Sequence, residues 1–366
     1  MKEKKSLHIL GSLSRTLLGI TFIFSGFVKA VDPLGTTYKI GDYLQEGFGG
    51  FLQWAMPLAE PAAWALITVE FVLGVCLLLN IRTQWTSWLA LAMMLVMTPL
   101  TLYIAIANPV TDCGCFGDAI VLSNWATFWK NIVLLVLVVI LLLTKKHIPS
   151  TFQWHAELCI ACFAVGIVAG FMLYARLHLP VIDFRPYKVG NNLPELMEYP
   201  EGAEPDQYET LFIYEKDGVQ QTFTLQNYPK GDSTWTFVDQ QTRLVKKGYE
   251  PPIHDFVLTT LDGDDITDIV LEADRAVLIV MYDLQKADKK QLQKVHSLIE
   301  ETEDWCYILT GSGDELIEEF ARDYDLPIEQ FCQADPIMLK TTVRANPGVM
   351  VLQNGTVVEK YNFRNK

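Results

Sequence analysis

The chain has few basic side chains for its length. Its 366 residues contain 29 Lys and Arg against 43 Asp and Glu, a formal net charge of −14 at pH 7. A protein that binds nucleic acid neutralises phosphates with a basic face. This composition provides no such face, so nucleic acid is excluded as an expected partner.

Cysteine is also scarce and odd in number. The seven cysteines are Cys76, Cys113, Cys115, Cys159, Cys162, Cys306 and Cys332. A small secreted domain that depends on disulfides has a dense, even set of cysteines. The chain therefore lacks a disulfide framework, and the close pair Cys113 and Cys115 needs its own explanation.

The charge is unevenly distributed. Residues 1–180 contain 11 Lys and Arg and 9 Asp and Glu, whereas residues 181–366 contain 18 and 34. Half of the whole chain is hydrophobic (50%). These figures predict an apolar first half and an acidic, soluble second half.

Five apolar segments in the first half are long enough to cross a bilayer, which takes about 20 residues. They are His8–Val31, Pro57–Leu79, Trp85–Ala107, Trp125–Thr144 and His155–Leu179. The first is longer than the apolar core of a cleaved signal peptide, so we expect it to be retained. The lipid bilayer is thus a predicted partner.

Basic residues near the ends of these segments predict their orientation. Lys2, Lys4 and Lys5 precede the first segment, Arg82 lies between the second and third, and Lys145 and Lys146 follow the fourth. With five spans, all of these positions fall on one side, the cytoplasm. The cysteine loop and everything after Leu179 fall on the opposite, oxidising side.

The cysteine pair lies in the polar stretch Thr111–Asp118, between two apolar segments. A disulfide across Gly114 would close a small, strained ring, and strained disulfides are the labile ones. Static disulfide bonding and packing of two free thiols are the alternatives. A metal site is not expected, because no histidine is near and Asp112 and Asp118 would complete an unusual ligand set.

Residues 181–366 predict two soluble parts. The strands Tyr208–Lys216 and Val219–Leu225 flank Asp217-Gly218, a hairpin signal, and Trp235–Val238 is a candidate third strand. From Pro251 strands alternate with helices and end in an antiparallel hairpin, an α/β order. The predicted domains are a transmembrane helical bundle at 1–180, a β-rich linker subdomain at 181–250 and an α/β domain at 251–366.

The first half resembles the DoxX and MauE membrane proteins. Arg15–Pro33 reads like their first helix, and Glu70 and Cys113–Gly117 (C-G-C-F-G) strengthen the resemblance. It covers about residues 10 to 145 and implies disulfide formation or maintenance in exported proteins. DoxX relatives were first described as quinol-oxidase subunits, which implies a membrane quinone as a candidate cofactor. The fifth helix and long tail resemble DoxX-family proteins of the Bacteroidetes and imply a bacterial inner (cytoplasmic) membrane.

The tail resembles thioredoxin-like domains. Pro252–Phe256 followed by L-T-T-L-D-G is similar to their entry segment, and Arg344–Val349 stands where the fold carries its cis-proline. Asp283–Lys286 replaces the family's C-x-x-C. The resemblance implies a thioredoxin-like domain without the usual dithiol, in which Asn346 and Pro347 lie beside a strand edge that binds a partner.

Glu70 lies near the middle of an apolar helix, where an ionisable group is costly and is a functional candidate by default. We expect a role in moving protons or in quinone chemistry. The alternative is a buried ion pair with Arg15, and Lys29 would then be a third partner or would extend toward the interface.

The remaining cysteines are expected to be inert. Cys159 and Cys162 share one helix face, and like Cys76 they are predicted to pack as small apolar residues. Cys306 and Cys332 lie in or near separate strands of the tail, where we expect buried thiols.

The sequence therefore predicts a redox-associated membrane protein, with Cys113 and Cys115 exchanging disulfides with an exported periplasmic client and Glu70 assisting. Neither cysteine has a base or a positive charge beside it in the sequence, so the sequence does not identify the one that attacks. One alternative is a non-enzymatic scaffold of an envelope complex, in which C-G-C is a structural staple. A transporter is a third option, disfavoured by the lack of an internal repeat.

The orientation can be tested with reporter fusions after Lys146 and after Lys366. We expect opposite signals, the first cytoplasmic and the second periplasmic, because the basic residues flanking the helices favour the cytoplasm. Two fusions that report the same side would show that one of the five helices does not span the membrane.

Overall fold

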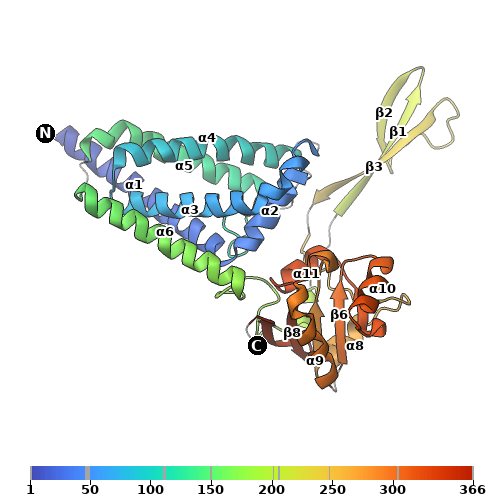
Figure 1. Cartoon of the computed structure of the whole chain (residues 1–366). Coiled ribbons are helices and arrows are strands. Elements are labelled where there is room, and N and C mark those ends of the chain that lie inside the picture. The colour runs from blue at the N-terminus through green and yellow to red at the C-terminus, as the bar shows by residue number, and fades with distance from the viewer. Residues whose placement is uncertain are drawn as a thin grey trace.

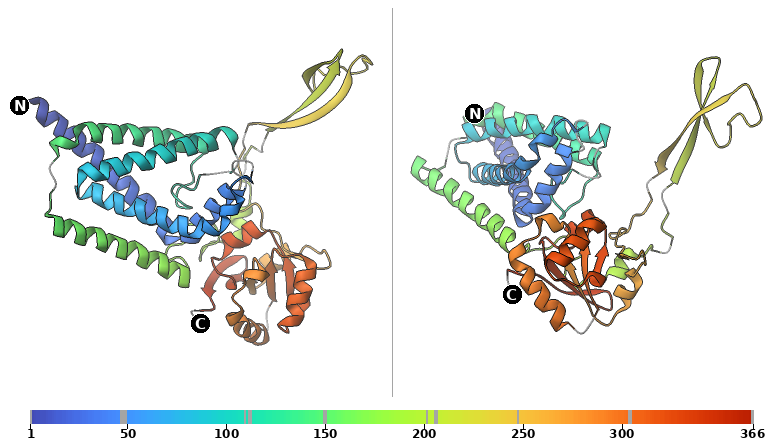
Figure 2. Two further views of the ribbon diagram at one scale, coloured as in Figure 1. Left: turned by 45° about the horizontal axis from the view of Figure 1, so that its top comes forward. Right: turned by 45° about the vertical axis from the view of Figure 1, so that its right-hand side comes forward.

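The computed structural model describes residues 2–45, 50–108, 110, 113–148, 151–200, 202–204, 207–246, 248–302 and 305–364. Thr111 and Asp112, which precede the cysteine pair, lie outside these residues. A helical bundle is joined at one end to an α/β domain, and a small sheet projects from the region of the junction (Figures 1 and 2). We call the end of the bundle that meets the α/β domain the domain end.

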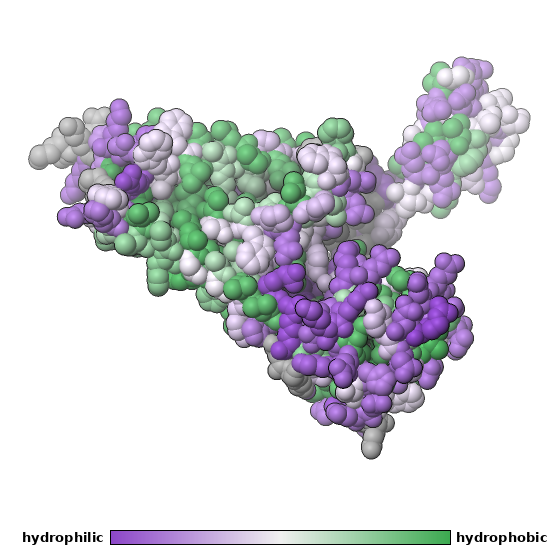
Figure 3. All heavy atoms as spheres, in the orientation of Figure 1, coloured by the Kyte–Doolittle hydropathy of each residue, from purple (hydrophilic) through white to green (hydrophobic). Residues whose placement is uncertain are grey.

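All five expected spanning helices are present. They are α1 (Lys2–Val31), α3 (Ala59–Leu78), α4 (Thr83–Ala107), α5 (Asn124–Thr144) and α6 (Trp154–Leu177). Each contains a segment long and apolar enough to cross a membrane. The outer surface of the bundle is largely hydrophobic, whereas the α/β domain is largely hydrophilic (Figure 3), as expected for a bilayer-embedded bundle and a soluble domain.

Helices α1 and α3 form the centre of the bundle because small residues let their backbones approach. A Cβ atom at Gly74 of α3 would lie 2.5 Å from the backbone nitrogen of Ile23 in α1. At Gly26 of α1 the nearest atom would be the backbone nitrogen of Phe71, at 2.8 Å. Close packing of this kind is the usual basis of helix association in lipid.

The structure contains a helix that the sequence analysis missed. No helix was predicted after Asp32, but α2 (Pro33–Gln45) lies across the domain end of the bundle (Figure 1). Asp32 precedes a proline, which disfavours continuation of α1, and Pro33 suits the first position of a new helix. The break between α1 and α2 thus follows from one Asp-Pro pair.

The α/β domain is built on a six-stranded sheet in the order β4-β7-β6-β5-β8-β9. Its strands are β4 (Thr259–Thr260), β5 (Ala276–Val280), β6 (Trp305–Thr310), β7 (Phe331–Gln333), β8 (Gly348–Gln353) and β9 (Thr356–Asn362). Strand β5 pairs in parallel with β6 and antiparallel with β8. All five residues of β5 are buried, as in a strand covered on both faces.

Short helices cover both faces of this sheet. They are α8 (Thr267–Glu272), α9 (Leu292–Glu301), α10 (Asp314–Asp323) and α11 (Pro336–Thr342). Two hydrophobic clusters, one on each face, contain alternate residues of β5, such as Leu278 in one and Ile279 in the other. The expected alternation of strands and helices is confirmed, although β4, β7 and α8 were not predicted.

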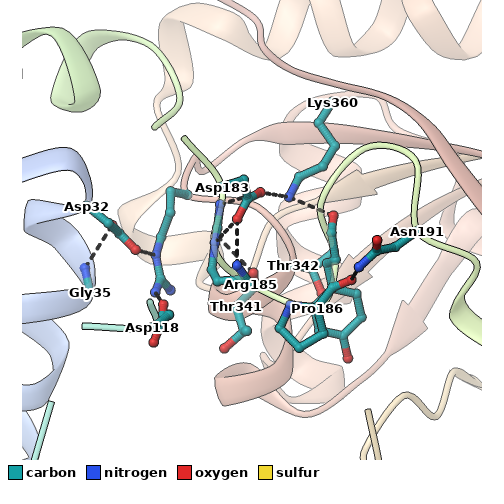
Figure 4. Close-up of polar contacts among 12 residues, drawn as sticks. Asp32, Gly35, Asp118, Asp183, Arg185, Pro186, Asn191, Thr341, Thr342 and Lys360 are labelled. Carbon is teal, nitrogen blue, oxygen red and sulfur yellow. Dashed lines mark hydrogen bonds and ion pairs between the residues drawn. The ribbon is translucent and has the colours of Figure 1, made fainter. Parts of the chain in front are cut away.

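The predicted extent of the β-rich linker subdomain, residues 181–250, is wrong in part. Tyr187 and Leu193 are buried in the core of the α/β domain, and α7 (Leu193–Met197) follows. The Gly190 N–H donates to the Val357 carbonyl at 2.8 Å. Asp183 also pairs with Arg185 and Lys360 (Figure 4), so the segment that leaves the membrane belongs to the α/β domain.

The small sheet has the order β2-β1-β3. Its strands are β1 (Gln207–Lys216), β2 (Val219–Thr224) and β3 (Thr236–Lys246). The hairpin at Asp217-Gly218 is confirmed, but β3 extends well beyond the predicted Trp235–Val238. Edge-to-face contacts of Tyr214 with Phe223 and Phe237 form its own aromatic cluster, and the sheet projects away from the other two parts (Figure 2).

Candidate functional site

Cys113 and Cys115 lie at the domain end of the bundle, in the loop between α4 and α5. Their Sγ atoms are 3.1 Å apart and both cysteines are free thiols. Each residue is only 8% exposed, so both thiols are buried. The structure holds the dithiol form, and the disulfide remains a prediction for the oxidised protein.

Helix α2 covers the cysteine loop. Gly114 has a φ of +64°, and a Cβ atom there would lie 3.2 Å from Cγ of Lys39, so glycine fits this position on both counts. Four residues along the same helix, the Tyr43 hydroxyl donates to the Cys113 carbonyl at 2.7 Å. Lys39 and Tyr43 thus present one face of α2 to the thiols.

A chain of buried polar groups connects Glu70 to the cysteine loop. Lys29 Nζ donates to Glu70 Oε2 and to Ser25 Oγ, each at 2.7 Å. The Ser25 hydroxyl in turn donates to the Cys115 carbonyl at 2.7 Å. Lys29 is therefore the partner of Glu70, and the chain fixes α1, α3 and the cysteine loop to one another.

The alternative that we considered for Glu70, an ion pair with Arg15, is not found. Arg15 Nη1 donates instead to the carbonyls of Leu77 and Leu78, the second at 2.7 Å. These carbonyls lie at the end of α3, where a helix has unsatisfied acceptors and a partial negative charge. The sequence alone does not fix the register between α1 and α3, and this register places Lys29 rather than Arg15 beside Glu70.

The polar chain borders a small cavity inside the bundle. The cavity has a volume of about 20 Å³ and is lined by Ser25, Lys29, Glu70, Cys115 and Lys130 together with methionines of α4. Lys130 of α5 lies over the Phe116 ring, 4.3 Å from its centroid. Two cations therefore lie near Cys115, although neither is its neighbour in sequence.

These surroundings separate the two thiols electrostatically. A hydrogen bond between the two sulfurs, together with Lys130 and Lys29, lowers the pKa of Cys115 against the opposing effects of burial and Glu70. The shared hydrogen bond and burial raise the pKa of Cys113. Since the thiolate is the nucleophile, the positive charges beside Cys115 favour it as the attacking group.

The other cysteines lie apart from this site. Cys76 is buried in the bundle, as expected, but Cys159 and Cys162 are exposed on α6 and do not pack in the interior. Burial raises the pKa of Cys306 to about 11 and that of Cys332 to about 12. Thiols in such surroundings are protonated at neutral pH and unreactive.

Asn346 and Pro347 lie at the junction between the bundle and the α/β domain. Their peptide bond is cis, and Asn346 Nδ2 donates to the Asp283 carbonyl at 2.7 Å. They line a pocket of about 300 Å³ that also includes Tyr38 of α2 and Gln291. Within the part of the chain that the structure describes, Asn346 Oδ1 and Gln291 Oε1 are buried and have no hydrogen-bond partner.

Arg344 links this junction to the cysteine loop. Its Nε is 2.8 Å from Asp32 Oδ2 and its Nη2 is 3.4 Å from Asp118 Oδ2. Asp32 lies between α1 and α2, and Asp118 lies three residues after Cys115 (Figure 4). Burial alone would raise the pKa of Asp32, but Arg344 and Arg185 outweigh it and the pKa is lowered, so Asp32 is ionised.

No metal centre is evident among the residues described. In these ranges no group of three or more His, Cys, Asp and Glu side chains is placed to hold a metal ion. Asp118, which we considered beside the thiols, pairs with Arg344 instead.

Residues 7–144 match the family model of the methylamine utilisation protein MauE. The membrane domain is therefore similar to MauE over these residues. Together with the five apolar helices, this match supports a multi-pass membrane protein. Residues 208–247, the small sheet, match a domain of unknown function (DUF8463), and no match to a curated protein was found.

The charges around Cys115 predict the pH dependence of its alkylation. Its rate should rise with pH through a midpoint below the ordinary thiol pKa of about 8.5, because the thiolate is the reacting form. Lys130→Gln should raise that midpoint by about one unit. The measurement is iodoacetamide labelling of the reduced full chain between pH 5 and 10, followed by mass spectrometry of the Cys115 peptide.

Lys145→Gln is the matched control for this experiment. Lys145 follows α5 at its other end and lies 4.4 Å from the centroid of the Trp88 ring, a similar contact far from the thiols. An equal shift in both variants, or a wild-type midpoint at the ordinary thiol value, would contradict the assignment of Cys115 as the thiolate.

Proposed function

We propose that this MauE-type protein exchanges disulfides with exported proteins at the periplasmic face of a bacterial inner membrane. The observation that carries the proposal is the pair of thiols 3.1 Å apart beside two lysines. A structural staple needs neither a close cationic environment nor an asymmetry between its two sulfurs. A cationic environment and an asymmetry between the sulfurs both help an exchange site, because one thiol must attack as a thiolate while the other stays protonated until it resolves the mixed disulfide.

The proposed reaction begins at Cys115. Its thiolate attacks one sulfur of a client disulfide, the client S–S bond breaks, and the leaving client sulfur takes a proton from water. Cys113 then loses its proton and attacks the Cys115 sulfur of the mixed disulfide, the bond between Cys115 and the client sulfur breaks, and that second client sulfur takes the proton from Cys113. The products are the Cys113–Cys115 disulfide and a client with two thiols, so two electrons pass to the client. The reverse sequence oxidises a client dithiol.

A membrane quinone does not fit the cavity beside Cys115. A volume of about 20 Å³ has room for about one water molecule, which is far smaller than a quinone ring. The methionines and lysines that line it would have to separate to admit a ring. The proposed reaction therefore includes no quinone step.

Glu70 acts through Lys29 in this proposal. The polar chain ends on the Cys115 carbonyl rather than on its sulfur, so its first effect is to position the loop and the Lys29 ammonium. In the reverse direction, where client thiols give up protons, the Glu70 carboxylate is an anionic acceptor that lines the cavity. The Lys29 ammonium favours an ionised Cys115, whereas the Glu70 carboxylate itself opposes it.

For the α/β domain we propose a thioredoxin-like fold that binds partners and does not react. The cis Asn346–Pro347 bond and the order of strands around β5 support this assignment, and Asp283–Lys286 takes the place of the dithiol. The junction pocket offers two acceptors without partners among the described residues, Asn346 Oδ1 and Gln291 Oε1. Such acceptors suit the N–H donors of an extended client segment.

A scaffold role is the second candidate. The observation that favours it is the small sheet, which projects from the body (Figure 1) and leaves large apolar side chains such as Phe237 and Val245 exposed. Exposed apolar residues on a protruding element are typical of a docking surface. The two roles differ in whether Cys113 and Cys115 form bonds with a partner.

Trapping of mixed disulfides tests the exchange reaction. In Cys113→Ser the attacking Cys115 remains but the resolving thiol is gone, so we expect adducts with exported proteins to accumulate. Cys115→Ser should give few or none, because Cys113 is buried and the cations of the cavity lie beside position 115. The adducts are measured by acid quenching, alkylation and non-reducing electrophoresis with and without reductant.

Cys76→Ser is the control for this trap, since Cys76 is buried away from the loop and should leave the adduct pattern of wild type unchanged. Equal trapping by Cys113→Ser and Cys115→Ser would assign the wrong nucleophile. Absence of adducts in both would favour the scaffold.

The buried ion pair gives a separate test of Glu70. Glu70→Gln leaves the Lys29 ammonium unpaired in the bundle, and breaking such a pair costs about 3–5 kcal/mol. The double variant Lys29→Met with Glu70→Met removes both charges and should recover thermal stability in detergent. We expect the double variant to exchange disulfides slowly despite its recovered fold. Normal exchange by a stable double variant would reduce the pair to a structural element.

A further inference from the structure

Buried thiols need an opening before they can meet a client. Cys113 and Cys115 are each 8% exposed, and Lys39 and Tyr43 of α2 lie against the loop that carries them. The client disulfide cannot reach a sulfur while α2 stays in this position. What holds α2 in place therefore decides when the thiols react.

The opposite contacts of α2 are made with the α/β domain. The Tyr38 hydroxyl donates to the Tyr282 hydroxyl at 3.1 Å, and the Arg344 guanidinium lies 5.3 Å from the centroid of the Tyr38 ring. Asp32, immediately before α2, pairs with the same arginine at 2.8 Å. The helix is thus held between the cysteine loop and the α/β domain.

Arg344 forms ion pairs both with the start of α2 and with the end of the cysteine loop. It binds Asp32 at the start of α2 and Asp118 at the end of the cysteine loop, and its side chain is only 6% exposed. An arginine fork can hold two carboxylates in a fixed geometry. The room for this fork exists because residue 35 is glycine: a Cβ atom there would lie 3.0 Å from Arg344 Nη2 and 2.8 Å from Asp32 Oδ2.

We propose that Arg344 is a positioning residue for the thiol site: it fastens α2 and the Cys113–Asp118 loop together, and its release from Asp32 and Asp118 uncovers Cys113. The inference rests on the proposed exchange reaction for its purpose. Arg344 directly precedes Ala345 and Asn346 in the junction pocket, so a client segment bound there lies beside the fastening. Occupancy of the pocket and exposure of the thiols are thereby coupled through one side chain.

Two substitutions separate the fastening from helix stability. Gly35→Ala forces a methyl group against Asp32 and Arg344, although alanine is intrinsically the better helix former. Gly41→Ala is the matched control in the same helix, because its Cβ atom would meet only Met56 Cε at 3.6 Å, an ordinary contact. Both changes favour α2 as a helix, and only the first disturbs the ion pairs.

The measurement is the rate at which N-ethylmaleimide labels Cys113 in the reduced full chain, resolved by mass spectrometry. Arg344→Gln and Gly35→Ala should each raise this rate about tenfold or more, since a loss of ~1.4 kcal/mol in the closing free energy is tenfold in the open population. Arg344→Lys should recover part of the protection. Arg82→Gln, which loses an ion pair with Glu157 on α6 away from the junction, and Gly41→Ala should not change it.

Cys306 and Cys332 report on the α/β domain in the same sample. They should stay protected in every variant, because their burial in the sheet does not depend on Arg344. An unchanged rate at Cys113 in both Arg344→Gln and Gly35→Ala overturns the inference. Parallel labelling of Cys306 and Cys332 also overturns it, because Arg344 would then hold the domain together rather than the cover. Neither outcome depends on a client, so the exchange reaction is judged separately by the mixed-disulfide trap.

Discussion

The Lys29 ammonium is the charge on which the arrangement of the membrane domain depends. An ammonium inside an apolar bundle is costly unless it is paired and hydrogen-bonded, and Lys29 is 4% exposed. Its two hydrogen bonds bind Glu70 on α3 and Ser25 on its own helix. Through Ser25 the same group reaches the Cys115 carbonyl, so satisfying one buried charge also fixes where the cysteine loop lies.

The same constraint shapes the reactivity of the thiols. Burial disfavours any thiolate, and a cysteine pair covered by α2 would be inert without compensation. Lys29 and Lys130 supply positive charge on the side of Cys115, and Cys113 supplies a hydrogen bond. Helix α2 and the two lysines act in opposite directions. The helix keeps partners away from the thiolate, and the lysines stabilise the thiolate. A site of this kind keeps its thiolate formed while it is closed and reacts only after it opens.

Much of the architecture followed from simple patterns. Twenty-residue apolar runs located all five spanning helices, and Asp217-Gly218 located the hairpin, because both signals are local.

The errors came from contacts between distant segments. Glu70 pairs with Lys29 rather than Arg15 because of the register of α1 against α3, which Gly26 and Gly74 set. Tyr187 and Leu193 joined the α/β core through β9, and no local pattern in 181–250 indicates that. Lys130 near Cys115 became visible only when α5 was placed beside the loop.

The proposed role of Arg344 would explain why a domain without a dithiol stands beside a domain that has one. A tethered partner-binding domain raises the local concentration of client near the thiols, but a permanently open dithiol next to it would react with any disulfide. An arginine that lies between the junction pocket and the covered loop joins the two requirements, because the client's own binding energy can offset the ion pairs that keep α2 closed. A ligand shifts such an equilibrium only by its differential affinity for the open state. Clients that fill the pocket without displacing Arg344 would therefore be held but not exchanged.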